Sequence, residues 1–268
     1  MKRLFACLFG VLLASSALAC GPDTNCMVGD RHYRIAMPDG HDGATPVPAI
    51  IFAHGYRGSA KGVMRNGSLR ALASDLGAAL IAVKSDGPGW DLPNGPRTLD
   101  SDGSAEFAYF EAVIDDAANR FAIDTDRLVA TGFSAGGMMV WNLACARPAQ
   151  FAGFIPIAGT FWKAPPDRCA TPAASVIHIH GDADKTVPLL GRVIGPTKQG
   201  EVPATLEMYE RFGDFGAPEQ MRYDGLRCEV QTNAGGDVLE FCLFSGGHAF
   251  RTEHLRHGWA ELEKAGQL

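Results

Sequence analysis

Short, uninterrupted apolar runs recur along this chain of 268 residues and alternate with segments of helical periodicity. Apolar runs of this length are typical of strands that are covered on both faces of a sheet. They lie at residues 49–53, 78–83, 128–130 and 154–158, and two further strands are expected at residues 175–180 and 238–243. Residues 31–37 alternate between polar and apolar positions instead, which predicts an edge strand.

Three segments between these runs have the composition of helices, at residues 59–76, 105–120 and 135–146. In the second segment, Phe107 and Phe110 belong to an apolar stripe on one face, as expected for a helix that packs on a sheet. Strands that alternate with helices predict an α/β fold with a mostly parallel central sheet and helices on both faces. Ligands of such folds bind beyond the carboxyl ends of the strands.

The first residues of the chain have a different character from the rest. Lys2 and Arg3 precede an apolar run over residues 4–13, and residues 17–19 read Ala-Leu-Ala, a small-x-small cleavage signal. We interpret residues 1–19 as a secretory signal peptide. The protein is therefore expected to be exported, to the periplasm or the extracellular space.

The remaining residues 20–268 carry no linker, charge block or internal repeat, so we expect one domain and a monomer. A lipoprotein anchored through Cys20 is the alternative, although Ala17 stands where such signals usually carry leucine. No other apolar run is long enough to span a membrane. The formal net charge of −6 becomes −8 without the two basic residues of the leader, so we expect no nucleic-acid partner.

Seven cysteines become six once Cys7 leaves with the leader, and an even number in an exported chain indicates disulfides. Six cysteines allow 15 connectivities. Closeness in sequence favours Cys20–Cys26 and a turn at Gly235 favours Cys228–Cys242, and Cys145–Cys169 is the pair that remains. No C-x-x-C or histidine-rich spacing occurs, so we expect no metal site and no cofactor.

The most informative motif is Gly132-Phe133-Ser134-Ala135-Gly136, between the strand at residues 128–130 and the helix at residues 135–146. A serine at a sharp strand-to-helix turn projects its hydroxyl above the sheet, at a helix N-terminus that favours negative charge. Glycines two residues to either side are expected because larger side chains would collide with the neighbouring strand and helix. Ser134 is therefore a candidate nucleophile, and the alternative is a structural Gly-Ser turn.

A serine nucleophile requires a base and an acid that orients the base. The loop after residues 175–180 supplies Asp184, with Asp182 as the alternative acid, and the loop after residues 238–243 supplies His248 as the base. His254 and His257 fall on the following helix and are expected to be solvated. The order serine, acid, histidine is that of α/β-hydrolases.

Two residues on other loops have alternative interpretations. His54 follows the strand at residues 49–53, and we expect it to anchor its loop rather than to act as a base. Trp90 lies in a long loop over residues 85–103, where it either walls a pocket or packs in the core.

Several motifs together resemble the secreted esterase family of α/β-hydrolases that includes polyhydroxybutyrate depolymerases and feruloyl or acetylxylan esterases. The similarity covers residues 20–265 and rests on a set of motifs in a fixed order. They are Tyr33, His54-Gly55 with Gly58, Trp90-Asp91, Gly132-Phe133-Ser134-Ala135-Gly136-Gly137, His180-Gly181 with Asp184 and Val187-Pro188, and Gly247-His248. This resemblance implies an α/β-hydrolase fold over residues 20–268 and a serine esterase that acts on small-molecule or polymeric esters.

The resemblance also implies site residues. Ser134, Asp184 and His248 would form the catalytic triad, and the backbone N–H groups of Tyr56 and Ala135 would form the oxyanion hole.

The chain departs from these relatives at Tyr56, where they often have cysteine, and at Phe250, where they often have tryptophan. Phe250 and Trp90 are the candidate pocket residues. A serine peptidase on the same fold and a noncatalytic exported binding protein are the alternative functions.

Overall fold

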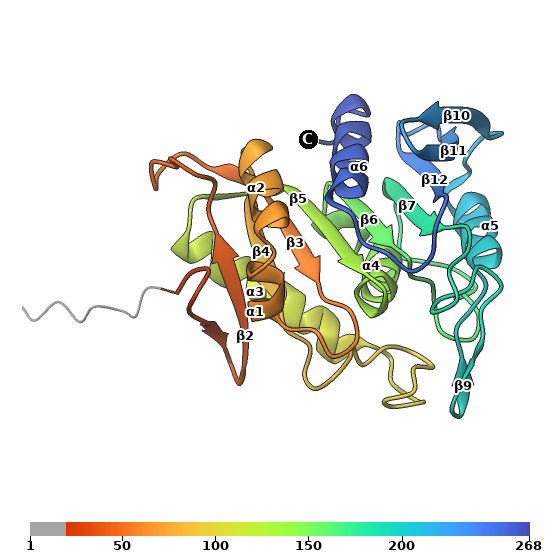
Figure 1. Ribbon diagram of the computed structural model, residues 1–268, viewed down its shortest axis with the longest axis horizontal. Helices are drawn as coiled ribbons and strands as arrows, with labels where there is room; N and C mark the ends of the chain where they lie inside the picture. The colour runs from red at the N-terminus through yellow and green to blue at the C-terminus, as the bar shows by residue number, and fades with distance from the viewer. Residues whose placement is uncertain (1–19) are drawn as a thin grey trace, which may run out of the picture.

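The computed structural model describes residues 20–268, and a sheet runs through the middle of the described part (Figure 1). The predicted signal peptide, residues 1–19, lies outside the described residues. Ten strands of this part form the sheet in the order β1-β2-β4-β3-β5-β6-β7-β12-β11-β10. They are β1 (Cys26–Val28), β2 (Arg31–Ala36), β3 (Val47–Ala53), β4 (Ala79–Val83), β5 (Ile123–Phe133), β6 (Gly153–Ile157), β7 (Val176–Gly181), β10 (Glu219–Tyr223), β11 (Leu226–Thr232) and β12 (Val238–Phe244).

The six central strands, from β4 to β12 in the sheet order, are all parallel to one another. Antiparallel strands flank them, with β2 and β1 on one side and β11 and β10 on the other. The prediction of a mostly parallel sheet is therefore confirmed. Since parallel strands end at the same edge, the loops after β3, β5, β7 and β12 come together along one side of the molecule (Figure 1).

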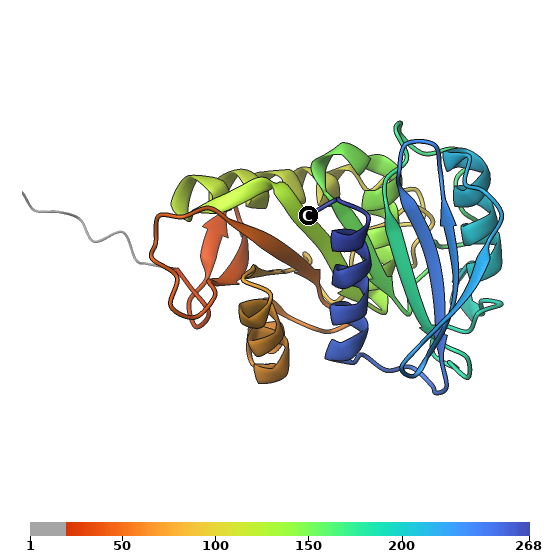
Figure 2. The same ribbon diagram turned by 90° about the horizontal axis from the view of Figure 1, so that it is seen from above.

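Helices cover both faces of the sheet, as Figure 2 shows. The helices on one face are α3 (Ser104–Arg120), α4 (Ala135–Ala146) and α5 (Val202–Gly213), and those on the other are α1 (Ala60–Met64), α2 (Gly67–Asp75) and α6 (Thr252–Lys264). A 3-10 turn, η1 (Pro148–Gln150), and a small hairpin of β8 (Val193–Ile194) and β9 (Thr197–Lys198) complete the described elements.

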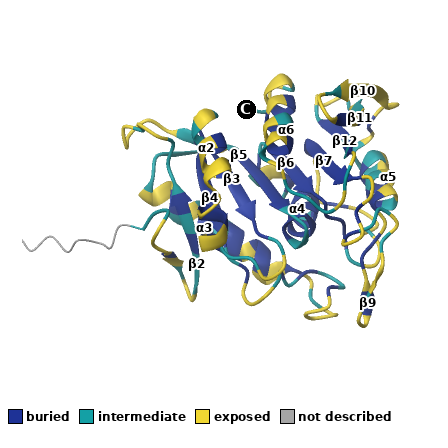
Figure 3. Cartoon of the chain, in the orientation of Figure 1, coloured by how far each residue is buried: buried dark blue, intermediate teal, exposed yellow. Residues whose placement is uncertain are grey.

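Alternation along the strands divides the core into two layers. Ile51 and Ala53 of β3 belong to the apolar cluster with α3 and α4, whereas Ile50 and Phe52 belong to the cluster with α1, α2 and α6. All four side chains are buried, as is most of the central sheet (Figure 3). The continuous apolar runs of the sequence are therefore strands that are covered on both faces.

Three expectations about the elements were wrong or incomplete. Residues 59–76 form two helices instead of one, because the Asn66 side chain accepts a hydrogen bond from the Leu69 amide (3.1 Å) and starts a new helix. Residues 31–37 are not the edge strand, since β1 pairs outside β2. The sequence also gave no expectation for α5 or for β8 to β11.

The three predicted disulfides are present in the structure. Cys20 bonds to Cys26, Cys145 to Cys169 and Cys228 to Cys242. The last bond joins directly paired residues of β11 and β12, and Cys145–Cys169 ties the end of α4 to the segment before β7.

A protein that lacks residues 1–19 is therefore expected to show no free thiol when it is titrated under denaturing, non-reducing conditions. Reduction should then lower the midpoint of thermal unfolding, since a native disulfide typically contributes about 2 to 4 kcal/mol. Two or more free thiols per chain would contradict the pairing.

Candidate active site

Ser134 lies between the last residue of β5, Phe133, and the first residue of α4, Ala135. Its backbone has φ 61° and ψ −120°, a conformation that costs free energy for any residue with a side chain. The Ser134 amide donates to the carbonyl of Ile157 (2.9 Å), and the Ser134 carbonyl accepts from Met138 in the first turn of α4 (3.0 Å). The neighbouring strand and the helix therefore hold the serine in this strained turn.

The glycines of the motif are required by the close approach of the backbone. A Cβ on Gly132 would lie 2.5 Å from the carbonyl oxygen of Gly136, and a Cβ on Gly136 would lie 1.9 Å from that of Ala53. Both distances are far below van der Waals contact. Only glycine at these two positions lets β3, β5 and α4 approach closely enough to form the turn.

His248 lies next to this turn. Its Nδ1 is 2.7 Å from Oδ2 of Asp184, and its ring lies over the ring of Phe133 with 4.5 Å between the centroids. Within the described chain no hydrogen bond joins the Ser134 hydroxyl to His248. Such bonds are often long in proteins without substrate and shorten when substrate binds.

The carboxylate of Asp184 is held from several directions. Oδ1 accepts the backbone amides of Thr186 (2.7 Å) and Val187 (2.9 Å), and Oδ2 faces His248 and lies 3.5 Å from Nε2 of His180. Burial raises the pKa of Asp184, but the hydrogen bonds from His180, His248 and the two amides outweigh burial and hold this pKa well below its ordinary value. Asp184 therefore remains ionised in mildly acidic solution.

Asp182, the alternative acid, points elsewhere. Its carboxylate pairs with Arg227 (2.9 Å) and accepts the amide of Gly246 (3.0 Å). These contacts attach β11 and the loop after β12 to the loop after β7. Of the two aspartates, Asp184 is the one that contacts His248.

The loop after β3 packs against the serine turn. A Cβ built on Gly55, the residue before Tyr56, would lie 3.5 Å from Cβ of Ser134. Among the described residues, neither the amide of Tyr56 nor that of Ala135 donates to a backbone carbonyl in a turn, loop or helix cap. The Ala135 amide belongs to the first turn of α4, where a helix has no partner of its own for its N–H groups.

The buried side chains of His54 and Trp90 contact the backbone of this loop. His54 is 2 % exposed, with Nε2 facing the amide of Ser85 (3.2 Å) and Nδ1 the carbonyl of Gly55 (2.7 Å), so both ring nitrogens contact the backbone. The Trp90 indole donates to the carbonyl of His54 (2.9 Å) and packs on Phe110. Trp90 is thus buried and packs in the core, which is one of its two interpretations from the sequence.

Phe250 lines a hollow of about 220 Å³ that also touches Gly55 and Phe133, the neighbours of Tyr56 and Ser134 in the chain. Its ring packs edge-on against Phe52, with 5.3 Å between the centroids. A larger hollow of about 740 Å³ lies beside α5 and contains none of the candidate residues. Of these two hollows, the one at Phe250 reaches Phe133, the residue before Ser134.

The expectation that His254 and His257 are solvated was wrong. His254 is 5 % exposed and packs on the ring of Phe244, with 4.5 Å between the centroids. His257 contacts both carboxylate oxygens of the buried Glu240 (3.1 Å each). The polar pattern of α6 suggested solvent exposure because the helix sequence alone cannot show that His254 packs on Phe244 and His257 contacts Glu240, both residues of β12.

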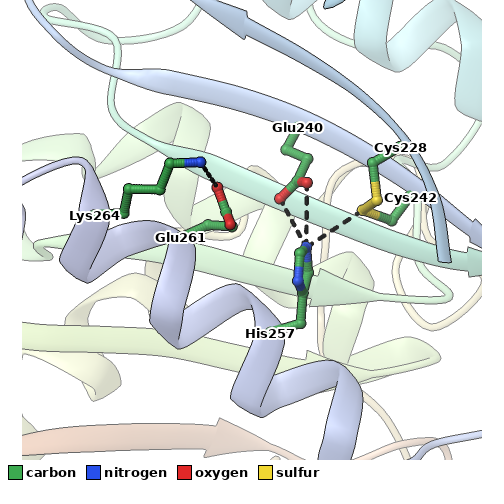
Figure 4. The surroundings of a disulfide bond; sticks show 6 residues. All are labelled: Cys228, Glu240, Cys242, His257, Glu261 and Lys264. Carbon is green, nitrogen blue, oxygen red and sulfur yellow. Dashed lines mark hydrogen bonds and ion pairs between the residues drawn. A yellow bond between two sulfur atoms is a disulfide. The ribbon is translucent and has the colours of Figure 1, made fainter. Parts of the chain in front are cut away.

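Figure 4 shows this second cluster, in which Cys228, Glu240, Cys242 and His257 place ligand atoms within 4.8 Å of one another. These residue types would suit Zn²⁺ if both sulfurs were thiolates. In the structure the two sulfurs are bonded to each other, and His257 instead pairs with Glu240. The cluster as it stands is a disulfide beside a histidine–carboxylate contact.

Three buried histidines are expected to make stability depend on pH. Burial lowers the pKa of His54 and His254 to about 4, and that of His178 well below its usual value. Above pH 6.5 these side chains are neutral in both states, whereas below it the unfolded chain takes up protons that the folded chain refuses until about pH 4. The free energy of unfolding should therefore fall between pH 6.5 and pH 4, by about 3 kcal/mol for each of His54 and His254.

Urea unfolding at pH 7.5, 5.5 and 4.5 measures this dependence. His254→Leu is a suitable partner variant because Nδ1 of His254 is buried without a hydrogen-bond partner, so the change removes one titrating group and no polar contact of that atom. The variant should lose less stability than the wild type on acidification. Equal free energies of unfolding at pH 7.5 and pH 4.5 in the wild type would contradict the prediction.

The sequence analysis gave no role to the two histidines of β7, His178 and His180, which are both fully buried. A signal was available, since two polar residues within a buried apolar strand must find polar partners. The sequence did not show that one of those partners is Asp184.

Comparison with known proteins finds sequence similarity to esterases. The sequence model of the phospholipase/carboxylesterase family matches residues 93–194. NocK of Nocardia uniformis subsp. tsuyamanensis, named as an esterase, is 32 % identical over 248 residues, which cover 82 % of this chain and 70 % of that protein. Feruloyl esterase C of Emericella nidulans is 29 % identical over 171 residues, which cover 62 % of this chain and 59 % of that one.

Among solved structures, acetyl xylan esterase from Aspergillus awamori superposes with a TM-score of 0.62 at 16 % identity. The superposition covers 93 % of this chain and 97 % of the other. At this identity the likeness shows a shared fold.

A mostly parallel sheet with a strained serine at a strand-to-helix turn defines an α/β-hydrolase. With its relatives, the chain belongs to the esterase family of α/β-hydrolases that includes feruloyl esterases, and it is a carboxylic ester hydrolase. No helix within residues 20–268 combines the length and the apolar character needed to cross a membrane.

Proposed function

We propose that the protein hydrolyses carboxylic esters through an acyl-enzyme formed on Ser134, with His248 as base and Asp184 as the acid that orients it. The observation that carries the proposal is the position of the His248–Asp184 pair beside the strained serine turn. Asp184 holds Nδ1 of His248, which leaves Nε2 to accept the serine proton.

In the first half of the reaction, Ser134 Oγ attacks the ester carbonyl carbon while His248 takes the serine proton. The carbonyl oxygen becomes negatively charged, and the amides of Tyr56 and Ala135 donate to it. The C–O bond to the alcohol then breaks, and His248 returns the proton to the leaving alcohol oxygen.

In the second half, water attacks the acyl carbon as His248 removes its proton. The carboxylic acid leaves, and the proton on His248 returns to the Ser134 oxygen. Each turnover consumes one ester and one water and yields one acid and one alcohol. These steps need only the protein groups named here.

We propose a short acyl or hydroxycinnamoyl ester as substrate, free or attached to a polymer. The hollow at Phe250 is small and lined largely by apolar groups, which suits a compact acyl group. Relatives named for feruloyl esters support the hydroxycinnamoyl alternative. Phe250, a candidate pocket residue of the sequence analysis, lines this hollow, which supports the proposal.

We also propose that the protein is exported. Three disulfides in residues 20–268 are consistent with an oxidising compartment, where such bonds form and persist. The interpretation of residues 1–19 as a secretory signal peptide predicts how the protein is exported.

A panel of substrates tests the reaction class. Acetate to octanoate p-nitrophenyl esters, methyl ferulate, polyhydroxybutyrate and a peptide p-nitroanilide should be compared by kcat/KM on protein that lacks residues 1–19. We expect the short esters or methyl ferulate to give the highest values and the anilide to give none. Preference for the anilide would favour a serine peptidase, and no turnover of any substrate would favour a binding protein.

A further inference from the structure

A chain of hydrogen bonds crosses the core behind Asp184. The indole Nε1 of Trp141 donates to Nδ1 of His178 (3.0 Å), and Nε2 of His178 lies 3.0 Å from Nδ1 of His180. Nε2 of His180 in turn lies 2.8 Å from the carbonyl of Val187 and 3.5 Å from Oδ2 of Asp184. The chain therefore leads from α4 through β7 to the carboxylate that contacts the candidate base.

Each member of this chain is fully buried. Trp141, His178 and His180 are all 0 % exposed, and the two histidines are two residues apart on β7, so they share one face of the strand. Packing alone would be served by apolar side chains at these positions. Buried polar groups cost free energy unless they are hydrogen-bonded, and here every ring nitrogen has a partner.

The protons in this chain of hydrogen bonds can be arranged in only one way. An indole N–H can donate but not accept, so Nδ1 of His178 must be the acceptor. Burial, assisted by the nearby His180, lowers the pKa of His178, so the ring is neutral and carries its single proton on Nε2. That proton is donated to Nδ1 of His180, which leaves the proton of His180 on Nε2, facing Val187 and Asp184.

We infer that Trp141, His178 and His180 are positioning residues, which hold the Asp184 carboxylate and its loop in the orientation that His248 requires. This inference rests on the proposed catalytic role of Asp184.

The opposite arrangement of protons would be unfavourable next to Asp184. If His178 carried its proton on Nδ1, its Nε2 would become an acceptor and His180 would have to donate from Nδ1. Nε2 of His180 would then present a lone pair to the Val187 carbonyl and the Asp184 carboxylate, which is repulsive. The Trp141 donor excludes this arrangement from a distance, without touching Asp184.

Nuclear magnetic resonance of protein labelled with ¹⁵N-histidine tests the direction without any activity assay. Two-bond ¹⁵N–¹H correlations at pH 7 should show both His178 and His180 as neutral rings protonated on Nε2. A ring protonated on Nδ1, or on both nitrogens, would overturn the inference. This readout does not depend on Ser134 or on turnover, so it can succeed or fail separately from the proposed function.

Kinetics test the positioning role. Trp141→Phe keeps an aromatic ring but removes the donor, and we expect kcat for p-nitrophenyl acetate to fall about 10- to 100-fold with KM unchanged. The matched control is Trp259→Phe, because Trp259 is equally an interior indole (2 % exposed) that donates to Glu263, away from the site. Its kcat should stay within about twofold of the wild type.

A second pair of variants covers the case in which Trp141→Phe does not fold. His180→Gln retains an N–H that can donate to the Val187 carbonyl, whereas His180→Leu does not. The glutamine variant should keep a kcat at least tenfold above that of the leucine variant at similar thermal stability. Equal kcat values in this pair, or in Trp141→Phe and Trp259→Phe, would overturn the inference.

Discussion

Ser134→Ala is expected to lower kcat for ester hydrolysis by about a millionfold, the scale seen when the nucleophile of a catalytic triad is removed. The change removes one oxygen from a half-buried side chain, whereas the hydrogen bonds that hold the turn are made by the backbone amide and carbonyl of Ser134. The fold should therefore persist. Initial rates with p-nitrophenyl acetate, together with circular dichroism and thermal unfolding, measure both expectations.

The control is Ser68→Ala, which makes the same chemical change on the exposed face of α2. Its kcat should equal that of the wild type. A Ser134→Ala protein that retained a tenth of wild-type turnover would remove Ser134 from the mechanism.

Asp184→Asn should lower kcat about ten-thousandfold, as expected when the acid of a triad becomes neutral and no longer favours the correct histidine tautomer. The asparagine also lacks the negative charge of the carboxylate that accepts hydrogen bonds from the amides of Thr186 and Val187. The measurement is kcat on the same ester.

Asp182→Asn is the matched variant, since an asparagine oxygen can still accept the amide of Gly246. Its cost should be small by comparison, because Asp182 contacts Arg227 and not His248. A reversed order of the two variants would mean that Asp182 orients the base.

The central part of the fold could be predicted because it depends on local patterns. Continuous apolar runs identify strands that are covered on both faces, and the helix over 135–146 begins and ends where the sequence predicts. The glycines around Ser134 are required by the close approach of Ala53. The motif predicts such a close neighbour but does not identify it. The same local signals allowed the three disulfides to be paired.

The periphery could not be predicted in the same way. Four residues of β10 are exposed, and three of these four are polar, so the strand has no apolar run to reveal it. It forms because it pairs with β11. Likewise, the break at Asn66 depends on one capping hydrogen bond within a segment that is otherwise compatible with a single helix.

The surroundings of the candidate triad required the structure, because they depend on contacts between distant segments. Trp90 belongs to the core because Phe110 and the His54 carbonyl approach it from other elements. His180 is near Asp184 in sequence, but its hydrogen bonding is fixed by Trp141, 39 residues earlier and on another element, through His178.

Covalent labelling with a fluorophosphonate probe, followed by peptide mass spectrometry, tests the central claim most directly, because the probe reacts with a serine only when a base activates it. We expect one probe per chain, located on Ser134, with labelling lost in Ser134→Ala, slowed in Asp184→Asn and blocked by excess ester. Labelling of a different residue, or an unlabelled Ser134 in protein that still hydrolyses esters, would contradict the account.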